Sequence, residues 1–290
     1  MPLTLSHCPL CGSDKKRVFD KTFFKGQRVI NQICGNCGFV YQSPRMTESE
    51  LNAFYSGAYR ELYQGDEGPT EKDLKIQKGR AVRLIKFAKG SLKGATNHLD
   101  IGCSAGMLLD EFRTFYGCKS IGVEPGDSYR DYAQSRGNKV YADLDELKPD
   151  EGERFDLVSM AHVLEHIADP VKYLTKLRQE LMASDGYLLI EVPNLFSHDS
   201  FETAHMSSFS SHTLKQTLIK SGFSLQAFMR HGHPRTDILP LYLTGLAQAA
   251  DEFISRPVKP EFFVKEKRGF GLLFKQFMLR FFPKKSWINP

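Results

Sequence analysis

Four cysteines near the N-terminus fall into two pairs, each with two residues between its members. The pairs are Cys8 and Cys11 in CPLCG and Cys34 and Cys37 in CGNCG. Two intervening residues let one turn aim both thiolates at the same ion, and the glycine after each pair permits a tight backbone. Four thiolates complete the coordination shell of Zn²⁺ and leave no position for water. We therefore predict a structural zinc site.

The segment between the two cysteine pairs reads as two strands, KRVFDKTFF and QRVINQI, around a turn at Lys25 and Gly26. Two such runs joined at a glycine are typical of a hairpin. A hairpin flanked by two cysteine pairs is a zinc ribbon, which we predict for residues 1–45.

A short helix is predicted after this module. Thr47 and Glu50 form the capping-box pattern that begins helices. Three tyrosines recur every four residues and so share one face of that helix: Tyr55, Tyr59 and Tyr63. The stripe is either a packing surface or a row of hydroxyls that face an active site, and Tyr59 is the candidate for the second role. Residues 46–73 form the predicted linker.

An acid and two glycines follow an apolar run in LDIGCSAGM: Asp100, Gly102 and Gly106. A P-loop requires a lysine near its end, and this stretch has none. A dinucleotide loop prefers glycine where Ser104 stands, and Asp100 would repel a pyrophosphate. An acid instead suits a ligand with an ammonium group. S-adenosylmethionine (SAM) combines ammonium, ribose and adenine without phosphate, so we predict that this loop binds SAM.

The elements that must position this loop alternate between helix and strand from about residue 74. A helix over 74–89 precedes a strand over 97–101, and further helices separate the later strands. This alternation predicts a doubly wound, mostly parallel sheet. Ligands of such sheets lie at the carboxyl ends of the strands, which is where Asp100 and Glu124 stand.

DIGCSAG resembles the first motif of class I SAM-dependent methyltransferases, D/E-x-G-x-x-x-G. GVEPG, YADLDEL and FDLVSMAHVLEHIADP follow in that family's order. The resemblance implies a Rossmann-like seven-stranded sheet that uses SAM and releases S-adenosylhomocysteine. In the family, the acid at Glu124 takes the ribose hydroxyls, and the loop at Asp143 meets the adenine. The implied cofactor residues are Asp100, Gly102, Cys103, Ser104, Gly106, Glu124, Pro125, Asp143, Leu144, Ala161 and His162.

The zinc ribbon together with HMSSFSSHTL is similar to bacterial sugar methyltransferases, including C-methyltransferases of nucleotide-linked keto-sugars. In those C-methyltransferases a Glu-His pair precedes the FS element, whereas here His205 follows Ala204. Without that acid the base that C-methylation requires lacks support. We therefore predict O-methylation of a sugar or glycan precursor, and both a free and a nucleotide- or lipid-linked acceptor stay open. His205 is the predicted acceptor-side base, with His166 and Tyr59 as further catalytic candidates.

Three alternatives stay open at this point: an RNA methyltransferase that grips RNA with its ribbon, a C-methyltransferase of a keto-sugar, and a lipid or quinone methyltransferase. The net charge is +5, but residues 256–290 hold nine Lys and Arg against two Asp and Glu. The rest of the chain is therefore slightly acidic, which disfavours a nucleic-acid partner.

The methyltransferase domain is predicted over 74–250 and a basic amphipathic tail over 251–290. Four phenylalanines share one face of the tail helix: Phe270, Phe274, Phe277 and Phe281. That helix either docks on the core or a dimer partner, or lies in a membrane interface through residues 267–287. The sequence shows no secretory signal and no spanning segment, so we expect a cytoplasmic protein, with this tail as the alternative membrane contact.

Overall fold

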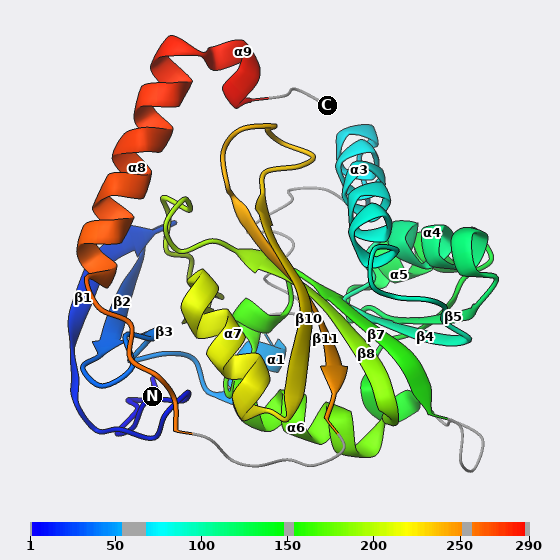
Figure 1. Cartoon of the computed structure of the whole chain (residues 1–290), viewed down its shortest axis with the longest axis horizontal. Coiled ribbons are helices and arrows are strands. Elements are labelled where there is room, and N and C mark those ends of the chain that lie inside the picture. Colours follow the sequence, from blue (N-terminus) through cyan, green and yellow to red (C-terminus); the bar gives the residue numbers. More distant parts are fainter. Residues whose placement is uncertain (1, 54–67, 148–153, 251–256, 288–290) are drawn as a thin grey trace.

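The computed structural model describes residues 2–53, 68–147, 154–250 and 257–287, and Figure 1 shows the chain. A seven-stranded sheet in the order β10-β11-β8-β7-β4-β5-β6 forms its centre. Only β11 runs antiparallel to its neighbours within this sheet, which confirms the predicted mostly parallel, Rossmann-like fold. The strands are β4 (Asn97–Ile101), β5 (Lys119–Val123), β6 (Lys139–Tyr141), β7 (Phe155–Ala161), β8 (Met182–Pro193), β10 (Phe223–His231) and β11 (Tyr242–Ala249).

Helices cover both faces of this sheet because successive strand residues point to opposite sides. On β8, Leu188 and Ile190 pack into one apolar cluster, and Leu189 packs into the other. One face carries α3 (Glu71–Ala88), α4 (Met107–Tyr116) and α5 (Asp127–Ser135), and the other carries α6 (Pro170–Glu180) and α7 (Ser211–Lys220) (Figure 1). Two 3₁₀ turns, η2 (Leu144–Glu146) and η3 (Leu164–His166), follow β6 and β7.

A second sheet has the order β1-β2-β3-β9 and contains the predicted hairpin. Its strands are β1 (Lys16–Phe24), β2 (Gln27–Cys34), β3 (Val40–Gln42) and β9 (Ser207–Ser208). Lys25 and Gly26 form the turn, both with positive φ. The last strand was not predicted: β9 belongs to the loop after β8, and Tyr41 pairs with Ser207 across the sheet. The N-terminal sheet is thus hydrogen-bonded to the loop that carries His205.

The capping box predicted at Thr47 begins α1 (Glu48–Ala53), with hydrogen bonds between Thr47 and Glu50 in both directions. A second capping box, between Thr70 and Asp73, begins α3. Residues 54–67 lie outside the described residues, so the predictions for Tyr59 and for the other two tyrosines of the stripe stay predictions.

The tail forms α8 (Val264–Phe281) and α9 (Pro283–Ser286) along one edge of the molecule (Figure 1). The helix docks through its polar side, because Arg268 donates to the carbonyl groups of Leu195 and His198, and Lys275 pairs with Asp199 at 2.9 Å. The four phenylalanines of the predicted face are between 50% and 75% exposed. Among the described residues, we find no helix that is both long and apolar enough to cross a bilayer.

Candidate active site

A cleft of about 1330 Å³ lies at the carboxyl ends of the parallel strands, where the strand order reverses at β4. All but one of the predicted cofactor residues line it: Asp100, Gly102, Cys103, Ser104, Glu124, Pro125, Asp143, Leu144, Ala161 and His162. The exception, Gly106, stands at the start of α4. The topology thus brings these residues together, while the contact that each makes with a cofactor stays a prediction.

The loop after β4 depends on glycine at two positions. Gly102 has φ +73°, and a Cβ there would lie 2.5 Å from the Val163 side chain. Gly106 has φ +77°, and a Cβ there would lie 2.9 Å from the amide nitrogen of Asn138. Any other residue would be strained at either position. The D-x-G-x-x-x-G spacing is therefore a requirement of this backbone as well as of its ligand.

Asp100 ends β4 as a buried carboxylate. Burial raises its pKa to about 7, although the Ser159 hydroxyl donates to Oδ1 at 2.6 Å and acts in the opposite direction. Ser159 is in turn fixed by His98, whose Nε2 lies 2.8 Å from the hydroxyl. A carboxyl group in this state favours a cationic ligand, because a nearby positive charge stabilises its ionised form.

We therefore expect the affinity for SAM to rise with pH. Below pH 7 the ligand must displace a proton from Asp100, so affinity at pH 6 should be about tenfold lower than at pH 8. Calorimetry at both pH values, in buffers of different ionisation enthalpy, measures the affinity and the released proton together. Asp100→Asn should abolish the dependence, and an affinity that does not change with pH would contradict this role.

Glu124 and Asp143 lie in the loops that follow β5 and β6, the next two strands along the chain. Glu124 accepts hydrogen bonds from the backbone N–H groups of Ser104 and Gly126, both at 2.9 Å. These bonds fix the carboxylate at the rim of the cleft and tie it to the glycine loop. Asp143 caps η2 by accepting from the Asp145 N–H at 2.8 Å. Both acids are thus held by backbone in the places that the resemblance assigns to ribose and adenine contacts.

A buried carboxylate that sequence reasoning missed organises the next part of the cleft wall. Glu191 lies 3.0 Å from Arg80 Nε, 3.2 Å from His162 Nε2 and 3.1 Å from His231 Nε2, and it accepts from the Thr244 hydroxyl. Burial alone would raise the pKa of Glu191, but the two imidazoles outweigh it and hold that pKa well below its usual range. The sequence held one signal for this residue: Glu191 is the only acid in the apolar run GYLLIEV.

Two predicted catalytic histidines lie side by side. The rings of His166 and His205 are 4.9 Å apart, edge to face, although 38 residues separate them in the chain. Nε2 of His166 lies 4.0 Å from Oε1 of Glu165, and Nε2 of His205 lies 3.7 Å from Oε2 of Glu202. Burial and the neighbouring His166 hold the pKa of His205 well below its usual range. His205 is therefore neutral at pH 7, and this environment makes it a weaker base than an ordinary imidazole.

The serines near His205 divide into two groups. Ser207 and Ser208 border a small cavity together with His205. Ser210 does not border that cavity. It is completely buried and caps α7, where its hydroxyl bonds to Thr213 and Glu261. Ser210 and Thr213, three residues apart, form a capping box, so the Ser210 hydroxyl is already hydrogen-bonded at the helix start.

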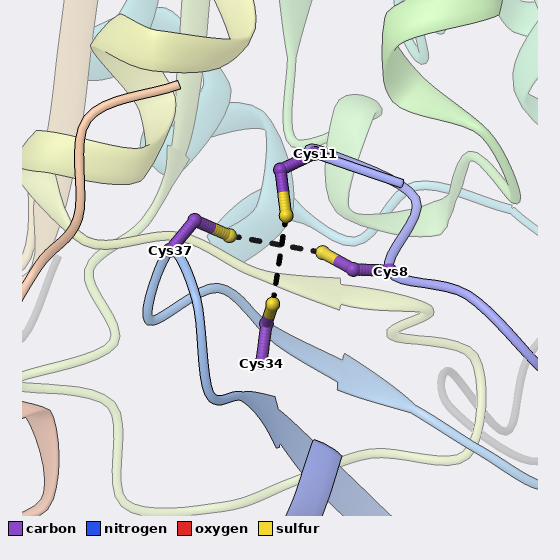
Figure 2. A group of neighbouring side chains, drawn as sticks. All are labelled: Cys8, Cys11, Cys34 and Cys37. Carbon is purple, nitrogen blue, oxygen red and sulfur yellow. Dashed lines mark hydrogen bonds between the residues drawn. The ribbon is translucent and has the colours of Figure 1, made fainter. Parts of the chain in front are cut away.

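The four cysteines of the two pairs converge at one point (Figure 2). Sγ of Cys8 is 3.7 Å from that of Cys37, and Sγ of Cys11 is 3.5 Å from that of Cys34. Sulfur atoms bound tetrahedrally to zinc at about 2.3 Å would lie about 3.8 Å apart. The observed spacing therefore fits one tetrahedral ion with four thiolate ligands.

The strand order, the glycine loop and the acids that follow successive strands define the class of SAM-dependent methyltransferases. Residues 74–227 match the family model described as a methyltransferase domain, which is more than half of the chain. The chain therefore belongs to this methyltransferase-domain family.

Curated relatives match a shorter stretch. The ubiquinone biosynthesis O-methyltransferases of Ruegeria sp. and Azorhizobium caulinodans are 32% and 31% identical over 102 and 122 residues. These matches cover 33% and 40% of this chain and 40% and 46% of those proteins, so the chain spans less than half the length of the curated relatives it matches.

A solved structure extends the likeness in fold. The 1,6-didemethyltoxoflavin-N1-methyltransferase of Burkholderia thailandensis, solved with its acceptor and S-adenosylhomocysteine, is 19% identical and has a TM-score of 0.56. The alignment covers 80% of this chain and all of that one. The similarity shows that the two chains share a fold.

Proposed function

We propose that this protein transfers the methyl group of SAM to a hydroxyl oxygen of a small acceptor. The observation that supports the proposal is the juxtaposition of two half-buried histidines: His166 borders the cleft lined by the SAM motifs, and His205 lies against it in a small cavity. The ubiquinone biosynthesis relatives are named as O-methyltransferases, which supports oxygen as the methylated atom.

The cleft residues have separate tasks in this reaction. Bound SAM supplies an electrophilic methyl group: a C–O bond forms, the C–S bond breaks, and its electron pair stays on sulfur. Asp100 and Glu124 hold the donor in place, so that alignment provides much of the rate. His205 takes the proton that the acceptor hydroxyl loses, since its neutral imidazole carries a lone pair.

Two acceptor classes follow from different observations. A sugar or glycan precursor, including a nucleotide- or lipid-linked one, rests on the resemblance of the ribbon and the His205 segment to sugar methyltransferases. A phenolic quinone precursor is favoured by the names of the curated relatives and by the exposed phenylalanines of α8. Those phenylalanines also support a peripheral membrane contact, because exposed Lys265, Lys267, Arg280 and Lys284 accompany them. The four cysteines, in turn, are proposed to hold one structural zinc ion.

Release of S-adenosylhomocysteine with each class of acceptor tests the proposal. We expect turnover with hydroxylated acceptors of one class and the methyl group on oxygen, located by mass spectrometry. Sedimentation with anionic vesicles accompanies the assay, and binding that Phe274→Ser weakens would favour the lipid-soluble class. Methylation found only on carbon, nitrogen or RNA would contradict the proposal.

A further inference from the structure

One carboxylate and two imidazoles meet at a single point between η3 and the loop that follows β8. Glu165, His166 and His205 each place one ligand-type atom within 4.8 Å of the other two. The first two residues come from η3 and the third from a distant loop, so the tertiary fold alone builds the group. His166 also borders the large cleft, whereas Glu165 and His205 border the small cavity beside it. The cluster therefore stands where the two spaces adjoin.

The Glu165 carboxylate lacks the partners that a buried charge requires. Its side chain is 2% exposed, and neither oxygen accepts a hydrogen bond within the part of the chain that the structure describes. The nearest nitrogen atoms belong to imidazoles: His162 Nδ1 lies 3.4 Å from Oε1 and offsets part of the charge, and His166 Nε2 lies 4.0 Å from the same oxygen. A buried carboxylate is strongly disfavoured without hydrogen bonds or a cation. This second observation points to a positively charged ligand.

The imidazole of His166 is already in the tautomer that metal ions select. Its Nδ1 lies 3.1 Å from the Ala204 carbonyl oxygen, which can only accept a hydrogen bond. Nδ1 therefore carries a proton, and Nε2, on the side of Glu165, is the nitrogen left to coordinate an ion. Metal-bound histidines are held in the same way by a carbonyl group behind the ring. One carboxylate and two imidazole nitrogens then match the ligand set of a divalent ion.

We propose that Glu165, His166 and His205 bind a divalent transition-metal ion such as Zn²⁺ or Mn²⁺ at the acceptor end of the cleft. Two histidines and one carboxylate suit these ions, and three protein ligands leave coordination positions open. Ligand atoms bonded at about 2.0–2.2 Å lie roughly 3–3.6 Å apart, so the three side chains draw together by about 1 Å on binding.

This inference rests on the proposed methyl transfer and deepens it, and in the metal-loaded protein solvent replaces His205 as the proton acceptor. An acceptor hydroxyl bound at an open position becomes more acidic beside the ion. Its proton then passes to solvent, because in the metal-loaded protein the lone pair of His205 is used for coordination. The acceptor class narrows to molecules whose reacting hydroxyl can coordinate a metal, which includes vicinal diols and catechols.

Cobalt titration of the full chain, stripped of metal and followed by absorption and by metal analysis, tests the site. We expect two equivalents in the wild type: one with thiolate-to-cobalt charge transfer from the four cysteines, and one without it. Glu165→Gln and His205→Ala should lose the second equivalent and keep the first. His212→Ala removes a histidine that bonds to the Lys259 carbonyl outside the cluster, and it should keep both.

Failure of the metal site and failure of the proposed methyl transfer give different results in these experiments. Calorimetry with S-adenosylhomocysteine on the same samples reports cofactor binding and shows that the variants are folded. A single equivalent in the wild type, or a second one that survives both substitutions, overturns the metal site and leaves methyl transfer standing. If neither variant folds, the NMR spectrum of the wild type tests the site instead. Bound cobalt should shift the signals of histidine ring protons, and unshifted histidine signals would overturn the site.

Discussion

Replacing Cys34 with serine is expected to remove the tightly held zinc and to unfold the N-terminal sheet. Three thiolates no longer close the tetrahedral shell, and structural zinc contributes about 10–16 kcal/mol in small zinc-binding domains. Because β3 pairs with β9, the damage should reach the loop that carries His205. Metal analysis after dialysis should show that the variant holds about one zinc per chain less than the wild type, and its thermal midpoint should be lower.

Cys118→Ser is the matched control for this substitution. Cys118 is also buried, but it directly precedes β5, where its Sγ lies 3.4 Å from the Ser120 hydroxyl, and it is not one of the four converging cysteines. This variant should keep its zinc. Full zinc content and an unchanged thermal midpoint in Cys34→Ser would show that the cysteines are merely four reduced thiols.

His205→Ala is expected to lower turnover by roughly 10²–10⁴ and to leave S-adenosylhomocysteine affinity almost unchanged. The lone pair of His205 is lost whether it serves as base or as metal ligand, whereas the cofactor motifs are untouched. Because the pKa of His205 lies well below its usual range, turnover of the wild type should not decline through its titration as pH falls from 8 to 6.5.

His166→Ala should be measured beside it, with His212→Ala as the control that retains turnover. If only His166→Ala is impaired, the base is His166 and the assignment of His205 is wrong. If His205→Ala loses cofactor affinity as well, the residue supports the fold of its loop rather than the chemistry.

The parts of the fold that the sequence predicted are those specified by local patterns. The loop at Asp100 combines an apolar strand with glycines at two positive-φ positions, so spacing alone locates it. The hairpin at Lys25 and the capping box at Thr47 are equally local. Glu191 is different, because its partners Arg80, His162 and His231 come from three other segments and only tertiary structure assembles them.

The docking of the tail helix also depends on tertiary contacts that local sequence patterns do not reveal. Periodicity correctly grouped the phenylalanines on one face of α8, but it could not tell which face docks. Arg268 and Lys275 face inward because the loop 194–206 offers carbonyl oxygens and Asp199 as partners. The pairing of β9 with β3 was hidden for a similar reason, since two residues carry no strand pattern of their own.

Calorimetry with S-adenosylhomocysteine tests the central claim most directly. Wild type should bind one equivalent, and Glu124→Ala should bind at least tenfold more weakly, since hydrogen bonds to a charged group contribute about 1.5–3 kcal/mol each. Glu111→Ala, an acid on α4 that pairs with Lys78, should bind like the wild type. No binding by the wild type, or equal binding by Glu124→Ala, would contradict the assignment of this cleft to SAM.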